Sequence, residues 1–484
     1  MKSLKDLLYR VPIQGVVGAT GITVAEICFD SRKVDLNDVF VAVRGTMVDG
    51  HHYIKQACDQ GAIAIICEEL PQHIINGITY VTVTDATQAM AYMADNFYDH
   101  PSAALTLVGV TGTNGKTTVA TLLYDLFTKL GHQTGLLSTV VNRIGAIERP
   151  ATHTTPDSLT INKLLRTMLD HDVTHCFMEA SSHGIDQNRT LGLTFAGGIF
   201  TNLSHDHLDY HHDFKSYRDV KKRLFDQLPQ SAFALVNLDD KNGAVMLQNT
   251  KASKVTYAQK SLADYKVNVL ERQLSGQLIK INQQEVWVKL IGAFNAYNLL
   301  AIYACADLLK QPGRETLRVL STLESVSGRF QYFISSTGVT AIVDYAHTPD
   351  ALDNVLSTIN DLRTGNESLI TVVGCGGDRD PEKRPKMGAI AASWSSKVIF
   401  TNDNPRNEDP QLILQAIEAG VAAQDFKKYV VIADRAQAIK TAVQMAAPKD
   451  IILIAGKGHE TYQEIKGQRF DFNDLEIVTD LLTN

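Results

Sequence analysis

Long apolar runs are missing from this 484-residue sequence, in which no stretch of 18 consecutive apolar residues occurs. Since a membrane-spanning helix needs about 20 such residues, we expect no membrane insertion. An excess of positive charge is missing as well, because 46 Lys and Arg residues stand against 53 Asp and Glu residues, giving a net charge of −7. The basic surface that binds nucleic acid is therefore not expected, and nucleic acid is excluded as a partner.

Cysteine is scarce, with six residues in the chain and no CxxC pair among them. A zinc knuckle or a thioredoxin-type redox site is therefore not expected. The run Ala62–Cys67 is apolar, as is typical of a buried and reduced thiol. A secretory signal is not expected either, because Arg10, Pro12 and Gln14 interrupt any apolar segment near the N-terminus. We expect a reduced, cytoplasmic protein.

The overall composition is that of an ordinary globular protein, with 44% apolar and 20% charged residues. At about 150 residues per domain, the length suggests roughly three domains. A linker is predicted at His100-Pro101-Ser102, because the residue before a proline is disfavoured in a helix. An α/β pattern then extends to about residue 330. We therefore predict domains over residues 1–100, 101–330 and 331–484.

The last third of the chain alternates between strand-like and helix-like segments. The predicted strands are Thr340–Val343, Leu369–Gly374, Val398–Thr401, Val430–Ala433 and Ile451–Ala455. Such alternation predicts a mostly parallel sheet, whose ligands bind beyond the carboxyl ends of the strands. Polar motifs follow four of these strands: Asp344-Tyr345-Ala346-His347, Gly376-Gly377-Asp378-Arg379-Asp380, Asp403-Asn404-Pro405-Arg406 and Gly456-Lys457-Gly458-His459-Glu460. Four convergent motifs on one edge indicate a binding site.

A glycine-rich loop joins the strand-like run Leu105–Val110 to an amphipathic helix that Gly131 closes. Its residues are Gly112, Thr113, Asn114, Gly115, Lys116, Thr117 and Thr118. Backbone N–H groups in such a loop form a cradle for phosphate. Lys116 can neutralise the terminal phosphates of ATP, and the Thr117 hydroxyl can bind Mg²⁺. The spacing is a shortened variant of the strict pattern, so the alternative is a glycine-rich turn with a surface lysine.

Two further polar motifs follow strand-like runs in the middle of the chain. Glu179 ends one such run, and beside a phosphate loop its carboxylate is a candidate Mg²⁺ ligand. The alternative is a capping or ion-paired glutamate. The second motif, Asn202–Tyr210, includes His205 and His207. Its place at a strand end favours a site, although a histidine-rich stretch is often only a polar loop.

Lys221 lies on the apolar face of a helix predicted over Tyr217–Leu228, whereas Lys222 and Arg223 are expected on the opposite side. A buried lysine is costly unless its amine is paired or neutral. A neutral amine can take up CO₂ as a carbamate, which then acts as a carboxylate. The alternative, favoured by the periodicity alone, is a lysine whose stem packs on the core while its ammonium reaches water.

Six motifs together resemble the Mur ligase family, in order and over nearly the whole chain. They are Gly112–Thr118, Glu179–Gly184, Asn202–His207, Gly292–Asn298, Gly328-Arg329 and Asp344–His347. The resemblance implies an α/β fold of three domains. These are a UDP-sugar-binding domain over 1–100, a central ATPase domain with a mostly parallel sheet over 101–330, and a Rossmann-like amino-acid-binding domain over 331–484.

The resemblance implies an ATP-dependent amide ligase of peptidoglycan precursor synthesis. ATP would phosphorylate the D-glutamate carboxylate of UDP-MurNAc-L-Ala-D-Glu, and an incoming amine would attack the acyl phosphate to give an amide, ADP and phosphate. Because the carboxylate and ATP repel each other, metals and Lys116 must screen both charges. Two Mg²⁺ ions and a CO₂-derived carbamate on Lys221 are implied, and a monomer is expected.

The resemblance also implies roles for individual residues. Thr117 and Glu179 would hold one Mg²⁺, and Glu179, His207 and carbamylated Lys221 would surround the second, which reverses the alternative that periodicity favours for Lys221. ATP contacts are implied for the glycine-rich loop and for Asn295, Asn298, Arg329 and Asp344, with His347 in the same motif as Asp344. Substrate contacts are implied for Ser31, Thr46, Met47 and Val48 at the UDP moiety, and for Thr154, Thr155, Ser181, Gln187 and Arg189 at the muramoyl-dipeptide end.

The motif Asp403-Asn404-Pro405-Arg406 resembles the signature of family members that add meso-2,6-diaminopimelate. Diaminopimelate carries a second carboxylate that lysine lacks, and a guanidinium fork binds a carboxylate bidentately. Arg379 is a second candidate for this contact. Gly456 and Glu460 complete the implied set, with Glu460 holding the ammonium.

Several alternatives stay open. The same ligase could use L-lysine, with Arg406 merely pairing with a neighbouring acid such as Glu408. A folylpolyglutamate-type amide ligase shares the phosphate loop and the ATP chemistry. A non-enzymatic nucleotide-binding module would bind ATP without substrate-dependent hydrolysis.

Overall fold

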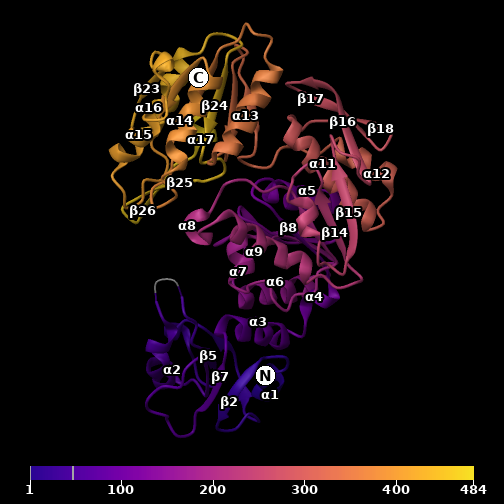
Figure 1. Cartoon of the computed structure of the whole chain (residues 1–484), viewed down its shortest axis with the longest axis vertical. Coiled ribbons are helices and arrows are strands. Elements are labelled where there is room, and N and C mark those ends of the chain that lie inside the picture. The colour runs from indigo at the N-terminus through magenta and orange to yellow at the C-terminus, as the bar shows by residue number, and fades with distance from the viewer. Residues whose placement is uncertain (1, 46–47, 484) are drawn as a thin grey trace.

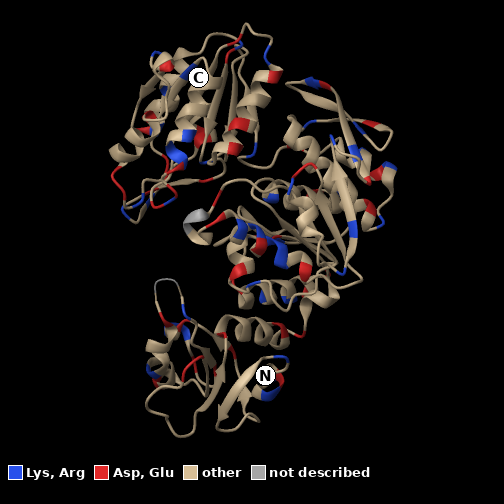
Figure 2. Cartoon of the chain, in the orientation of Figure 1, with Lys and Arg blue, Asp and Glu red and all other residues tan. Residues whose placement is uncertain are grey.

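Three main β-sheets, each built from its own part of the chain, form the framework of the molecule (Figure 1). The computed structural model describes residues 2–45 and 48–483. Figure 1 places the N-terminal part at one end, the central part in the middle and the C-terminal part at the other end. Acidic and basic residues alternate along the ribbon in all three parts (Figure 2). Within the described ranges, no helix has the length and apolar character needed to cross a membrane.

The N-terminal sheet has the strand order β2-β7-β6-β5-β4. Its strands are β2 (Ile13–Val17), β4 (Ile27–Cys28), β5 (Val39–Val41), β6 (Ala64–Cys67) and β7 (Thr79–Val83). Its helices are α1 (Leu4–Leu7), α2 (Ile54–Gln60) and α3 (Ala86–Phe97), and β1 (Lys2–Ser3) pairs with β3 (Thr23–Val24) beside them. Successive side chains of a strand point to opposite faces, so Val39 and Val41 enter one apolar cluster and Phe40 enters the other.

The linker predicted at residues 100–102 is only partly correct. Pro101 opens a short helix, α4 (Pro101–Ala104), because its missing N–H and fixed φ suit the first helical position. His100 stays outside this helix in a left-handed conformation with φ of 50°. Pro101 and Ser102 are buried, and Ser102 Oγ accepts a hydrogen bond from Thr194 N at 2.9 Å. The segment is therefore anchored to the central part of the chain.

The central sheet has the order β11-β10-β9-β12-β8-β13-β14-β15-β16-β17-β18. Strands β9 to β16 of this order run parallel, and the two ends are antiparallel. The strands are β8 (Thr106–Thr111), β9 (Thr134–Leu137), β10 (Val141–Ile144), β11 (Ile147–Pro150), β12 (His175–Glu179), β13 (Gly197–Phe200), β14 (Phe233–Asn237), β15 (Ser253–Ala258), β16 (Tyr265–Gln273), β17 (Gly276–Ile281) and β18 (Gln284–Val288).

Helices cover both faces of the central sheet. They are α5 (Lys116–Lys129), α6 (Ser158–Asp170), α7 (Ser182–Asp186), α8 (Leu208–His211), α9 (Phe214–Asp226), α10 (Gly243–Met246), α11 (Ala293–Leu308) and α12 (Gly313–Leu320). Val108 of β8 packs with α5 and α11 on one face, whereas its neighbour Leu107 packs with α6 and α9 on the other. Gly131 has φ of 94° just after α5, which confirms its predicted capping position.

The C-terminal sheet has the order β19-β20-β24-β21-β22-β23, and all pairs except β19–β20 are parallel. The strands are β19 (Gln331–Ile334), β20 (Thr340–Asp344), β21 (Leu369–Val373), β22 (Lys397–Phe400), β23 (Tyr429–Val431) and β24 (Ile451–Ala455), with a separate hairpin of β25 (Tyr462–Ile465) and β26 (Gln468–Asp471). The helices are α13 (Pro349–Leu362), α14 (Lys383–Trp394), α15 (Pro410–Glu418), α16 (Arg435–Met445) and α17 (Asp474–Thr483). The predicted α/β class with parallel sheets is confirmed.

Candidate active site

The glycine-rich loop leaves β8 and enters α5, as the sequence predicts. Gly112 has φ of 152°, and a Cβ there would lie 2.0 Å from Thr201 Oγ1. Gly115 precedes α5 with φ of 89°, in the left-handed region that glycine tolerates best. Only glycine fits both positions without displacement of a neighbour. The loop therefore lies directly against the end of β13.

Residues that follow β13 brace this loop. Asn202 accepts a hydrogen bond from Asn114 N on its side-chain Oδ1 at 2.9 Å and one from Thr113 N on its carbonyl at 2.8 Å. Thr201 Oγ1 donates to the carbonyl of Asn114 at 2.6 Å. The sequence placed Asn202 in a motif but gave it no role. The structure shows that it fixes the backbone of the loop.

Two lysines converge on the carbonyl of Gly112. Lys116 Nζ and Lys221 Nζ each donate to it at 2.9 Å, and Lys116 also donates to the carbonyl of Thr113 at 2.8 Å. Burial lowers the pKa of Lys116, and burial followed by repulsion from Lys116 lowers the pKa of Lys221 well below its usual value. Lys221 is therefore held toward the neutral amine. Its Nζ is buried, so the alternative in which it reaches water is wrong.

The prediction that Lys222 faces away from the core is wrong. Lys222 is buried like Lys221, whereas Arg223 is exposed as expected. Lys222 Nζ lies 2.6 Å from Asp226 Oδ1, one helical turn further along α9. This pairing lets the stem of Lys222 lie along the protein while its charge is satisfied at the helix surface. Lys221 and Lys222 are thus both buried but differ in having a carboxylate partner.

A carboxylate lies at the start of α5. Glu179 is fully buried at the end of β12, where Oε2 accepts from Thr117 Oγ1 at 3.0 Å and Oε1 accepts from Thr139 N at 2.7 Å. Arg329 reaches the same hydroxyl, with Nη2 donating to Thr117 Oγ1 at 3.1 Å. The predicted pair Thr117 and Glu179 is therefore assembled beside the phosphate loop.

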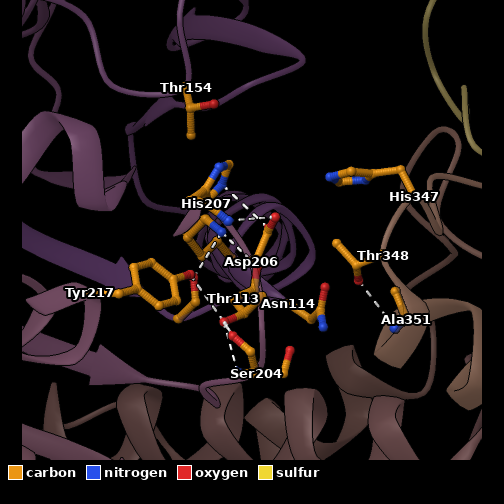
Figure 3. Close-up of polar contacts among 12 residues, drawn as sticks. Thr113, Asn114, Thr154, Ser204, Asp206, His207, Tyr217, His347, Thr348 and Ala351 are labelled. Carbon is orange, nitrogen blue, oxygen red and sulfur yellow. Dashed lines mark hydrogen bonds and ion pairs between the residues drawn. The ribbon is translucent and has the colours of Figure 1, made fainter. Parts of the chain in front are cut away.

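His207 follows in the loop between β13 and α8, with φ of 55°. Its Nε2 lies 3.4 Å from Asp206 Oδ2, and its ring lies 5.0 Å from that of His183. Burial lowers the pKa of His207 against the opposing effect of Asp206, so the imidazole is neutral and able to bind a metal. Figure 3 shows Asp206 and His207 beside Thr113 and Tyr217, with His347 on the side of the C-terminal part.

The donor set fits the magnesium that the resemblance implies. Within residues 2–45, 48–207 and 210–483, no group of three or more His, Cys, Asp and Glu side chains forms a metal site. The hydroxyl of Thr117 and the carboxylate of Glu179 are hard oxygen ligands that suit Mg²⁺. The amine of Lys221 is no such ligand, but a carbamate on it would supply the further oxygens. The Thr117 hydroxyl, the Glu179 carboxylate and the buried amine of Lys221 at Gly112 are thus consistent with the binding of Mg²⁺.

A cavity of about 400 Å³ opens beside the phosphate loop, between the central and C-terminal parts. Among its lining residues are seven of the predicted ATP contacts: Asn114, Gly115, Thr118, Asn295, Asn298, Arg329 and Asp344. Its size is typical of a small-molecule site. Burial raises the pKa of Asp344 to about 6, while its Oδ2 accepts from Phe330 N at 2.6 Å. The structure thus brings most of the predicted nucleotide residues to one cavity, whereas Gly112, Thr113, Lys116 and Thr117 are not among its lining residues.

The residues predicted for the muramoyl-dipeptide end form one hydrogen-bonded cluster, in which Thr154 and Thr155 of the loop before α6 meet the end of β12 and the residues that follow it. Thr155 Oγ1 donates to the carbonyl of Glu179 at 2.7 Å and accepts from Ser181 N at 2.9 Å. Arg189 donates to the carbonyl of Thr155 and, through Nε at 3.1 Å, to Gln187 Oε1. Thr154 joins the same region through Thr139 Oγ1 at 3.0 Å.

The residues predicted for the UDP moiety lie in the N-terminal part. Ser31 is buried and donates to Gln56 Oε1 at 3.2 Å, whereas Val48 is exposed. Thr46 and Met47 lie outside the described residues. The N-terminal and central parts are linked by Asn188, whose Nδ2 donates to Asp85 Oδ2 at 3.0 Å.

The amino-acid motifs meet at the carboxyl edge of the C-terminal sheet. Arg406 has φ of 50°, and its Nη1 donates to the carbonyl of Gly377 at 2.6 Å. The alternative partner Glu408 is wrong, because Glu408 pairs with Arg384 at 2.8 Å, while Arg406 Nε lies 3.8 Å from Glu464.

The other predicted residues of this edge lie in neighbouring loops. Asp403 Oδ2 lies where a Cβ on Gly456 would clash, at 2.7 Å, so these two residues touch. Asn404 Nδ2 donates to Glu460 Oε2 at 2.7 Å. Arg379 lies in the loop after β21, where its Nη1 donates to the carbonyl of Asp378 at 3.2 Å. Pro405 lies between Asn404 and Arg406 in the loop after β22.

Contacts between the central and C-terminal parts join the two sets of loops. Asn114 of the phosphate loop donates through Nδ2 to Asp350 Oδ2 of α13 at 2.9 Å. His205 Nε2 lies 3.5 Å from Asp380 Oδ2 in the loop that carries Arg379. The amino-acid edge and the phosphate loop thus face a common space.

Comparison with known proteins identifies all three parts. Residues 23–102 match the Mur ligase family catalytic domain, residues 110–306 match the Mur ligase middle domain, and residues 328–458 match the Mur ligase glutamate ligase domain. A UDP-N-acetylmuramoyl-L-alanyl-D-glutamate–2,6-diaminopimelate ligase of Cytophaga hutchinsonii is 53% identical over 480 residues, with 99% of each chain covered. The ligase of the same name from Phocaeicola vulgatus is 51% identical over 481 residues, again with 99% of each covered.

A solved structure carries the likeness into three dimensions. It is described as a UDP-N-acetylmuramoyl-L-alanyl-D-glutamate–2,6-diaminopimelate ligase, and it superposes with a TM-score of 0.71 at 32% sequence identity. The match covers 99% of this chain and 98% of the other.

Proposed function

The chain belongs to the Mur ligase family, and from that premise we propose that it joins meso-2,6-diaminopimelate to the D-glutamate carboxylate of UDP-MurNAc-L-Ala-D-Glu, with conversion of ATP to ADP and phosphate. The observation that carries this proposal is the convergence of Lys116 and Lys221 on Gly112, opposite the loops that hold Arg379 and Arg406. One site activates an acid, and the facing edge selects an amine with a second carboxylate.

The chemistry proceeds in two displacements. A carboxylate oxygen of D-glutamate attacks the γ-phosphorus of ATP, and the bond to the ADP oxygen breaks. The amine of the incoming amino acid then attacks the acyl carbon, loses a proton and releases phosphate. Both steps bring anions together, so cationic groups near the reacting atoms lower the barrier. Lys116 is the protein cation of the phosphate loop.

Thr117 and Glu179 would hold one Mg²⁺, and Glu179, His207 and carbamylated Lys221 would surround a second. Bound Mg²⁺ would screen the phosphate and carboxylate charges. The lowered pKa of Lys221 favours the neutral amine, which is the form that combines with CO₂. Lys116, Glu179, His207 and Lys221 form the proposed catalytic group.

The remaining roles follow the position of each residue. The cavity lined by Asn295, Asn298, Arg329 and Asp344 would hold the nucleotide. The cluster around Thr155 and Arg189 would hold the dipeptide end, and the region of Ser31 would hold UDP.

The amino acid would lie at the edge of the C-terminal sheet. Arg406 and Arg379 would bind the distal carboxylate of diaminopimelate, and Glu460 would bind its ammonium. A guanidinium fork makes two parallel hydrogen bonds to a carboxylate, which lysine cannot offer. Domains over 1–100, 101–330 and 331–484, a monomeric state and a cytoplasmic location complete the proposal.

Phosphate release tests the function directly. The purified chain is incubated with ATP, Mg²⁺ and UDP-MurNAc-L-Ala-D-Glu, with either meso-diaminopimelate or L-lysine. We expect release only when all substrates are present, and a kcat/KM for lysine lower by about 10²-fold, because a charge-assisted contact is lost. Equal turnover with lysine would sink the specificity, and activity with a folate acceptor alone would favour a folylpolyglutamate-type ligase. ATP binding without acceptor-dependent release would indicate a non-enzymatic module.

A further inference from the structure

A fully buried lysine, Lys457, lies behind the amino-acid edge of the C-terminal sheet. Its side chain is 0% exposed, and its Nζ donates to Asn404 Oδ1 at 2.9 Å and lies 3.0 Å from Glu460 Oε2. None of the proposed contacts with substrate involves Lys457. Burial of an ammonium is costly unless the charge is paired and hydrogen-bonded, so the structure must use both contacts.

Lys457 is one of two donors that fix the orientation of the Asn404 amide. Oδ1 of Asn404 accepts from Lys457 and from Glu464 N at 2.9 Å, while its Nδ2 donates to Glu460 Oε2 at 2.7 Å. A reversed amide would set Nδ2 against two donors and Oδ1 against a carboxylate. Lys457 and Glu464 N together therefore fix one orientation of the amide, and Lys457 also holds Glu460 directly.

The hydrogen bonds around Asn404 connect the loops that follow three neighbouring strands. Lys457 follows β24, Asn404 follows β22, and Gly377 follows β21. Gly377 N donates to the carbonyl of Asn404 at 2.9 Å, and the Gly377 carbonyl accepts from Arg406. A change at Lys457 would thus be transmitted through Asn404 to the loop that Arg406 grips.

We propose that Lys457 is a positioning residue for the amino-acid subsite, and this inference rests on the proposed function. Within the described part of the chain, both hydrogen bonds that Glu460 accepts from Lys457 and Asn404 fall on Oε2. Oε1 is then the oxygen that meets the ammonium of the incoming amino acid. Lys457 acts through Glu460 and Asn404 and does not itself touch the substrate.

The test is the variant Lys457→Met, which keeps the length of the side chain and removes its charge. We expect the KM for meso-diaminopimelate to rise about 10- to 100-fold, as for the loss of hydrogen bonds to charged groups. The KM values for ATP and for UDP-MurNAc-L-Ala-D-Glu should stay near those of the wild type. If Lys457→Met does not fold, Lys457→Gln keeps one donor, and a smaller rise confined to the same KM is expected. An unchanged KM for diaminopimelate in the folded variant overturns the proposal.

A double-mutant cycle with Glu460→Gln separates positioning from general stability. If Lys457 acts through Glu460, most of its effect on the KM for diaminopimelate should vanish in the Glu460→Gln background. Fully additive effects would refute the proposal.

The matched control is Asp450→Asn, a buried charge at the opposite end of β24, whose Oδ1 accepts from Ser368 N at 2.7 Å. It should lower the unfolding temperature without changing the KM for diaminopimelate selectively. A selective rise in this control would contradict the assignment to Lys457. Absence of diaminopimelate-dependent activity in the wild type would refute the proposed function instead. Failure of the proposed function is therefore distinguishable from failure of the role given to Lys457.

Discussion

The phosphate-loop end of the central sheet and the amino-acid edge of the C-terminal sheet treat buried charge in opposite ways. At the phosphate loop, Lys116 and Lys221 share one backbone carbonyl, and within residues 2–45, 48–207 and 210–483 neither forms an ion pair with a carboxylate. At the amino-acid edge, Lys457 is paired with Glu460 and hydrogen-bonded to Asn404. Both regions are loops that follow parallel strands, so the fold alone does not explain the difference.

The difference reflects what each region has to receive. A buried amine without a carboxylate partner destabilises the folded chain when it is charged, but it is free to act on what arrives there: Lys116 is proposed to meet an anion, and Lys221 to take up CO₂. Paired charges contribute no net attraction of this kind, but they hold loops in one geometry before the substrate binds. The first region is therefore suited to activation of an anionic acid. The second is suited to recognition of a substrate that fits the preset geometry of its loops.

The largest expected effect concerns the paired region. Arg435 and Asp474 form a fully buried ion pair, with Nη2 to Oδ2 at 2.7 Å, and Arg435 also donates to the carbonyl of Ala455 at 3.0 Å. Arg435→Met should lower the free energy of unfolding of this domain by about 3–5 kcal/mol, because Asp474 is left buried without a partner. Hydrogen exchange of the β24 amides measures it.

The exposed pair Lys289–Glu324 offers the control for this variant. Lys289→Met should change stability by less than about 0.5 kcal/mol. Equal effects of the two variants would show that burial of the pair does not matter.

The unpaired region is tested next by Lys221→Ala. Loss of the amine that is proposed to carry the carbamate should lower kcat by about 10²–10³-fold, the range seen when a preorganised charge-stabilising group is removed. Added formate or acetate should restore part of the activity by supplying a carboxylate in the same place. Phosphate release measures both effects.

Lys222→Ala is the matched control, since Lys222 is a buried neighbour on the same helix with Asp226 as its partner. It should retain most of the activity. Full activity of Lys221→Ala would remove the carbamate from the proposal.

The contrast between these neighbouring lysines shows how far the sequence can lead. Helical periodicity places Lys221 on the apolar face, and the resemblance assigns its role, but the burial of Lys222 depends on its pairing with Asp226. Periodicity assigns a face to each residue, whereas the path of a long side chain depends on partners one turn away. Lys457 is harder still, because a lysine in a polar loop gives no signal of complete burial.

The fold shows the same limit. Buried parallel strands such as β8, β21 and β24 are apolar runs, so the sequence predicts them within one or two residues. The antiparallel strands β16 to β18 are not predicted as apolar runs, because few of their positions are apolar and buried, as the largely exposed β16 shows. The buried parallel strands, whose ends carry the motifs, are therefore better predicted than the part of the central sheet beyond β15.

Arg406→Lys tests recognition at the paired edge with a smaller expected effect. Lysine keeps the charge but loses the planar fork, so kcat/KM for meso-diaminopimelate should fall by about 10-fold or more. Activity with L-lysine, which has no distal carboxylate, should hardly change, so discrimination between the two amino acids shrinks. Competition assays with both amino acids measure this ratio. A parallel fall for both substrates would indicate damage to the loop rather than loss of a carboxylate contact.

The smallest effect expected is on the stability of the unpaired region. The pKa of Lys221 is lowered in the folded chain, so between that pKa and the usual value of 10.5 the unfolded state binds more protons than the folded state. The contribution of Lys221 to stability is therefore unfavourable at low pH and improves as pH rises through this window. Lys221→Met should therefore raise the free energy of unfolding at neutral pH and flatten its rise with pH below 10.5. Denaturant unfolding in CO₂-free buffer with chelator measures the free energy of unfolding and its change with pH for both proteins. A variant less stable than the wild type at pH 7 would mean that the carbonyl contact stabilises the amine of Lys221 more than burial disfavours it.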